Sequence, residues 1–121
     1  MSHFHAVVWI DHTQAKVFRF NGEAAEKLVL EAHHPKHAEK HHIDEQNFES
    51  VAKALADAGE VLITGPGQTK TALMKHIAQH DAHLLSHITG IESADHPTDG
   101  QILAHARHYF EIHDHLTAQK V

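Results

Sequence analysis

The 121-residue sequence contains no cysteine, few basic residues and no long hydrophobic run. The lack of cysteine excludes disulfide bonds, zinc ribbons and thiol catalysis. The longest apolar run, Ala6 to Ile10, is far shorter than the roughly 20 residues that a membrane-spanning helix needs. Because no cationic segment precedes this run, the N-terminus is not typical of a signal peptide. We therefore expect a cytoplasmic protein with no membrane partner.

Lysine and arginine total 10 against 16 acidic residues, so the formal charge is −6 when every histidine is neutral. The fixed basic surface typical of nucleic-acid-binding proteins is therefore missing. Histidine is abundant instead, with 17 residues spread from His3 to His115. If all 17 were protonated, the charge would become +11. The chain can thus present a positive surface only under mildly acidic conditions.

The length fits a single domain over 1–121, and hydrophobic and charged fractions of 41% and 21% are close to globular averages. Strands are predicted, from their apolar and β-branched residues, over 4–10, 15–20, 25–32, 61–63 and 84–91. In the second strand, Phe18 and Phe20 indicate the core face. The short links between the first three strands predict an antiparallel meander.

Three helices are predicted between and after the later strands. Asp44 can cap the first, whose apolar residues Phe48, Val51, Ala52 and Leu55 have helical spacing, and Gly59 can end it. The second follows a Gly-Pro-Gly turn at 65–67, with Ala72, Leu73, Ile77 and Ala78 as its apolar positions. The third starts at a capping box at 98–101 and runs to about His113. The order β-β-β-α-β-α-β-α predicts a mixed five-stranded α/β sheet with helices on its faces.

Three segments resemble a known family. The hairpin at 6–18, the helix, buried strand and Gly-Pro-Gly turn at 48–70, and the approach to the last helix at 95–101 occur in the same order in it. The chain resembles the middle domain of the archaeal and eukaryotic peptide-chain release factors and Pelota, and their small bacterial relatives described as translational machinery proteins. This resemblance implies a ribonuclease H-like three-layer sandwich and a role in translation.

The sequence departs from release factors at one motif. The resemblance places a Gly-Gly-Gln tripeptide, which promotes peptidyl-tRNA hydrolysis, between the third strand and the first helix. Here that segment, His33 to Asp44, contains no glycine. The two Gly-Gln pairs, at 67–68 and 100–101, lie at the starts of other helices. We therefore expect a non-catalytic protein, not an enzyme, that binds the ribosome or structured RNA as Pelota does without the tripeptide.

The same segment is the candidate binding site. Its basic residues are His33, His34, Lys36, His37, Lys40, His41 and His42. Imidazoles can stack on bases and donate to phosphates, which favours ribosome or RNA contact. Three of them, His37, His41 and His42, could instead bind zinc, nickel or copper, although the fold requires no cofactor. A solvated loop is the third interpretation, and a homo-oligomer remains open.

Other motifs have less specific spacing. His76 and His80 lie four residues apart on one helix, as in half of a metal site, but surface or structural roles are commoner. The Gly-Pro-Gly turn lacks the spacing of a phosphate-binding loop before Lys70. Asp11 and Asp95 fall near strand ends, where carboxylates can hold magnesium for phosphodiester cleavage, and both also fit ordinary turn positions.

Overall fold

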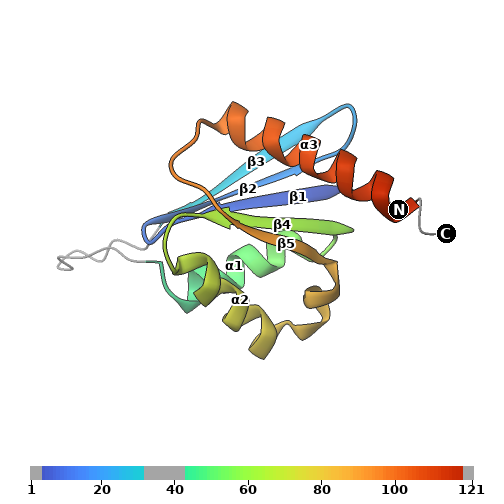
Figure 1. Ribbon diagram of the computed structural model, residues 1–121. Helices are drawn as coiled ribbons and strands as arrows, with labels where there is room; N and C mark the ends of the chain where they lie inside the picture. Colours follow the sequence, from blue (N-terminus) through green and yellow to red (C-terminus); the bar gives the residue numbers. More distant parts are fainter. Residues whose placement is uncertain (1–3, 32–42, 119–121) are drawn as a thin grey trace.

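The computed structural model describes residues 4–31 and 43–118, with side chains to Asp114 (Figure 1). The strands are β1 (His5–Ile10), β2 (Gln14–Phe20), β3 (Ala25–Glu31), β4 (Glu60–Gly65) and β5 (Ile88–Ser93). The helices are α1 (Glu45–Leu55), α2 (Thr69–His80), the short 3-10 helix η1 (Ala82–His87) and α3 (Asp99–Ala118). Within the described ranges, no helix combines the length and apolar character needed to cross a bilayer.

The five strands form one mixed sheet in the order β3-β2-β1-β4-β5. β2 pairs antiparallel with both β1 and β3, whereas β4 pairs parallel with β1 and β5. Figure 1 shows α1 and α2 on one face of the sheet and α3 on the other. The α/β class and the mixed five-stranded sheet predicted from the sequence are therefore confirmed.

Both faces of the sheet are buried at its inner strands, whereas the edge strand β3 is largely exposed. On β1, Ala6, Val8 and Ile10 join the core beneath α1 and α2, whereas Val7 and Trp9 join the core beneath α3. The prediction of a single core face on β2 was wrong. Phe18 and Phe20 pack toward α3 as expected, but the alternate positions Ala15 and Val17 are fully buried against the other helices. Helices on both sides leave no solvent face on a central strand.

The start of α1 follows the predicted chemistry. The Asp44 side chain accepts from the backbone N–H groups of Gln46 and Asn47, and the Asn47 side chain accepts from the N–H of Asp44. The four apolar positions predicted for this helix are its buried residues. The prediction that Gly59 ends this helix was wrong, because α1 ends at Leu55. Gly59 instead donates its N–H to the carbonyl of Phe4, the residue before β1.

Two further predictions need correction. In α2 the expected apolar positions Ala72 and Ala78 are exposed, and Lys70 and His76 are buried in their place. The predicted strand over 84–91 begins only at Ile88, because the preceding residues form η1. Leu84 is the buried residue of η1, so part of the apolar run that suggested a strand lies in a helical segment.

The carboxyl ends of β1, β3, β4 and β5 all lie at one edge of the sheet, since β2 alone runs in the opposite direction. We call this the carboxyl edge, and it comprises Asp11 to Thr13 after β1, Glu31 at the end of β3, 65–69 between β4 and α2, and 93–98 between β5 and α3. Ligands of open α/β sheets bind preferentially beyond the carboxyl ends of their strands. A ligand site is therefore expected at the carboxyl edge.

Candidate functional site

A cavity of about 980 Å³ opens at the carboxyl edge, on the sheet face that α3 covers. It lies between the ends of β4 and β5 and the first turns of α3. Its lining residues are Val7, Thr64, Glu92, Ser93, Ala94, Asp95, His96, Pro97, Gln101, Ile102 and His105. Apolar residues thus form its base, while two carboxylates and two imidazoles surround them, which is the character of many small-ligand pockets.

Trp9 fixes the segment at the mouth of this cavity. Its indole Nε1–H donates to the carbonyl of Asp95 at 2.9 Å, and its ring meets the His96 ring edge-on at 5.3 Å between centroids. The indole itself is buried, at 2% exposure, whereas the His96 side chain is 66% exposed. A buried aromatic residue therefore holds an exposed imidazole in place at the rim.

Asp11 organises the neighbouring turn. Its Oδ1 accepts from the N–H and hydroxyl of Thr13 and from the N–H of Gln14, at 2.9 to 3.0 Å. Burial raises the pKa of this carboxyl, but the three hydrogen bonds together hold the pKa below its ordinary value. Its other oxygen, Oδ2, lies 3.6 Å from His96 Nε2. Asp11 and His96 also line a second cavity of about 300 Å³ with His12 and the start of α2.

The charges at this edge occur mainly as acid–histidine pairs. His105 Nε2 lies 2.7 Å from Glu92 Oε1, and His96 Nδ1 lies 2.9 Å from Asp95 Oδ1. With neutral imidazoles these pairs leave the cavity rim net negative, and protonated imidazoles would balance it. Such a rim disfavours a polyanion at neutral pH and becomes more tolerant of one as the pH falls.

The turn between β4 and α2 is not a phosphate-binding loop. Gly65 and Gly67 have positive φ angles of 147° and 62°, and a Cβ on Gly65 would lie 2.0 Å from the carbonyl oxygen of Ile10. Lys70 is buried, and its Nζ donates to the carbonyl of Gly67 at 2.6 Å. Lys70 thus binds the backbone of the turn before it, as expected from a spacing that does not match a phosphate-binding loop.

The seven predicted site residues between His33 and His42 lie outside the described residues. The structure does place the flanks of this segment. The Asn47 side-chain amide donates to the carbonyl of Glu31 at 3.1 Å, and the N–H of Ile43 donates to the carbonyl of His12 at 2.8 Å. The segment therefore starts and ends at the carboxyl edge, beside the turn that Asp11 holds.

The two strand-end carboxylates occupy different settings. Asp11 is buried with its Oδ1 saturated by the turn, whereas the Asp95 side chain is 97% exposed. The described residues contain two groups of three side chains that could hold a metal, and neither includes Asp11 or Asp95. The hydrogen bonds of Asp11 are those of an ordinary turn residue.

The sequence predicted neither of these two groups as a whole, since it paired His76 with His80 and not with carboxylates. One consists of Glu49, His76 and Asp81, between α1 and α2, where His76 Nε2 lies 3.0 Å from Glu49 Oε2 and its ring is 4.6 Å from that of His80. The other consists of His5, Glu60 and Asp114, at the edge opposite the carboxyl edge. Both join residues distant in sequence, so only the tertiary fold reveals them.

Comparison with solved structures identifies similar folds. Pelota of Archaeoglobus fulgidus matches 87% of this chain with a TM-score of 0.62 and 12% identity. Dom34 of S. cerevisiae, a translation termination-like factor involved in RNA quality control and interacting with Hbs1, matches 84% with a TM-score of 0.58 and 17% identity. The archaeal translation termination factor aRF1 matches 96% with a TM-score of 0.56 and 14% identity.

No family model and no curated protein matches the sequence. The chain spans 31% of the Pelota and Dom34 chains and 41% of the aRF1 chain. The resemblance expected from the sequence is thus confirmed at the level of the fold. The chain has the fold of one part of the translation factors Pelota, Dom34 and aRF1.

Proposed function

We propose that this chain is a non-catalytic, translation-associated protein that binds the ribosome or structured RNA. The observation that carries the proposal is the fold shared with Pelota, Dom34 and aRF1, each of which is longer than this chain. Two of these proteins are described as termination or termination-like factors. A domain with their fold is suited to the same macromolecular setting.

Binding without hydrolysis follows from the composition of one segment. The chain between β3 and α1 has no glycine and no Gly-Gly-Gln tripeptide, and it carries five histidines and two lysines between residues 33 and 42. At the turn before α2, Gly67 has a positive φ and its carbonyl accepts from Lys70, so this Gly-Gln pair serves a helix start. We therefore expect no peptidyl-tRNA hydrolysis.

The proposed contact is the carboxyl edge together with the segment that starts and ends there. Its histidines would supply positive charge on protonation, which the chain otherwise lacks at −6. Binding should therefore strengthen as the pH falls from 7.5 to 6. The exposed His96 at the rim of the cavity lies on the same edge and would add to this effect.

Sedimentation with purified ribosomes at low salt tests the contact. The variant His37→Gln/His41→Gln should bind more weakly at pH 6 and lose part of the pH dependence, because it removes two of the five histidines of the segment. The matched control His83→Gln/His108→Gln changes two exposed histidines outside that edge and should bind like the wild type. Equal binding by both variants would refute the histidine contact.

The histidine content favours metal binding as the second candidate function. In that case His37, His41 and His42 would bind zinc, nickel or copper. Calorimetry with each ion, on the wild type and on His37→Ala and His41→Ala, separates the two functions. Stoichiometric binding at micromolar or tighter affinity that both substitutions abolish would favour the metal function.

A further inference from the structure

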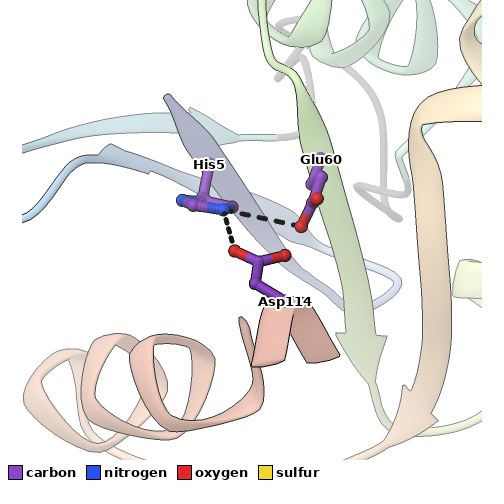
Figure 2. A group of neighbouring side chains, drawn as sticks. All are labelled: His5, Glu60 and Asp114. Atoms are coloured by element: carbon purple, nitrogen blue, oxygen red, sulfur yellow. Dashed lines mark hydrogen bonds and ion pairs between the residues drawn. The ribbon is translucent and has the colours of Figure 1, made fainter. Parts of the chain in front are cut away.

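Three side chains from distant parts of the sequence meet at the edge opposite the carboxyl edge (Figure 2). His5 begins β1 and Glu60 begins β4, and the parallel register places these two residues side by side. Asp114 reaches them from α3, after that helix has crossed the sheet (Figure 1). A contact among them therefore joins the two central parallel strands to the last helix.

The distances among the three side chains suit a small cation. His5 Nε2 lies 3.1 Å from Asp114 Oδ2 and 3.5 Å from Glu60 Oε2. With metal–ligand bonds of about 2.1 Å, tetrahedral coordination separates neighbouring ligand atoms by about 3.4 Å. All three ligand atoms lie within 4.8 Å of one another, so small side-chain adjustments would bring them to one ion.

The imidazole is already oriented for this role. Its ring centroid lies 4.5 Å from that of Phe110 and stacks 5.8 Å from that of Phe20. Both phenylalanines belong to the core beneath α3. The packed rings restrict the rotamer of His5, which lowers the entropy lost when its Nε2 binds a ligand.

One carboxylate oxygen at this point lacks a hydrogen-bond partner among the described residues. The Oε2 atom of Glu60 is buried and has no hydrogen-bond partner in the described part of the chain. A divalent cation would supply the missing partner of this oxygen and would stabilise the two neighbouring carboxylates as anions.

We propose that His5, Glu60 and Asp114 bind one divalent transition-metal ion of the zinc class, with solvent completing the coordination. One imidazole and two carboxylates suit zinc better than magnesium or calcium, which prefer six or more oxygen ligands. The side chains are 30%, 32% and 44% exposed, so an ion and a water can reach them. The ion would tie α3 to the sheet and would not depend on ribosome binding.

Cobalt(II) titration of the intact chain, followed by visible absorption and then by zinc competition, tests this site. The wild type should bind cobalt at this site, and zinc should raise its thermal unfolding midpoint. Asp114→Asn and Glu60→Gln should each lose one bound equivalent or weaken its binding at least 10-fold. Two conservative variants are used so that misfolding of one, seen by circular dichroism, leaves the other decisive.

Two control variants separate this site from other ligand groups. Asp81→Asn changes a carboxylate whose buried Oδ2 is likewise unpartnered but belongs to the other group of three. His37→Gln/His41→Gln/His42→Gln removes the predicted metal ligands of the 33–42 segment. Both controls should retain the equivalent that Asp114→Asn loses. The proposal is overturned if the wild type binds no cobalt at 100 µM, or if only a control variant loses binding.

Discussion

Replacement of Asp11 should destabilise the whole sheet, because this carboxylate forms the turn between its two central antiparallel strands. Its Oδ1 accepts three hydrogen bonds, and the residue is only 6% exposed. A hydrogen bond to a charged group contributes about 1.5–3 kcal/mol, but the donors on Thr13 and Gln14 can partly rehydrate after the change. Asp11→Ala should therefore lower the free energy of unfolding by about 2–4 kcal/mol.

Asp11→Asn separates the charge of this side chain from its hydrogen bonding. The amide oxygen can still accept from Thr13 and Gln14, but a neutral acceptor forms bonds about half as strong as a carboxylate does. We expect a loss of about 1–2 kcal/mol at pH 7, smaller than that of Asp11→Ala. Urea unfolding followed by the fluorescence of Trp9, the single tryptophan, measures both values.

The same comparison has a defined pH dependence. Because the folded-state pKa of Asp11 is lowered from 3.8, the stabilisation is complete above the unfolded pKa and is lost as pH falls through the folded pKa. The stability difference between wild type and Asp11→Asn should therefore shrink between about pH 5 and pH 2. A difference that stays constant over this range, or equal losses for the Ala and Asn variants, would refute this account of the turn.

Three further substitutions, the first with a matched control, test other parts of the fold. Gly65→Ala should lower the free energy of urea unfolding by at least about 3 kcal/mol, because the φ of Gly65 is 147° and the new Cβ would meet a backbone oxygen at 2.0 Å. The control Gly22→Ala, which has open space around it, should lower it by less than about 1 kcal/mol. Phe110→Ala removes a ring that is 2% exposed and should cost about 3–5 kcal/mol in the same assay. Hydrogen bonds from Lys27 and Lys16 lower the pKa of Asp99. Because the carboxylate is 38% exposed, Asp99→Asn should lower the free energy of unfolding by only up to about 1 kcal/mol at pH 7 and low salt. The loss should be smaller in 1 M salt, which screens the ion pairs, and at pH 3, where the carboxylate begins to be protonated.

Local signals predicted the elements whose chemistry is local. The α1 start was predictable because Asp44 caps it and the apolar residues from Phe48 to Leu55 recur at helical spacing. The capping box of α3 was predictable for the same reason, and Thr98 and Gln101 do bond to each other reciprocally. In both cases, a few neighbouring residues contain the whole interaction.

Features set by tertiary packing were not predictable in this way. The period of two along β2 indicated one core face through Phe18 and Phe20, but it could not show that helices cover both sides and bury Ala15 and Val17 as well. Leu84 lies in η1 and not in the predicted strand. The pattern could not show this, because a short 3-10 helix and a strand can have the same apolar run. Local pattern does not distinguish a buried strand from a buried turn.

The candidate sites divide in the same manner. The basic segment at 33–42 is conspicuous in composition, and the structure fixes its flanks at Glu31 and Ile43. The group at the opposite edge gives no such signal, because His5 and Glu60 become neighbours only through the register of β1 with β4. Asp114 joins them only because α3 runs back along the sheet.

Ribosome association tests the central proposal most directly. The wild-type chain is added at low salt to a bacterial lysate, and its distribution across a sucrose gradient is compared at pH 6 and pH 7.5. The proposed function predicts co-migration with ribosomal particles, stronger at pH 6, together with no release of peptide from peptidyl-tRNA. A chain that stays at the top of the gradient at both pH values would contradict it.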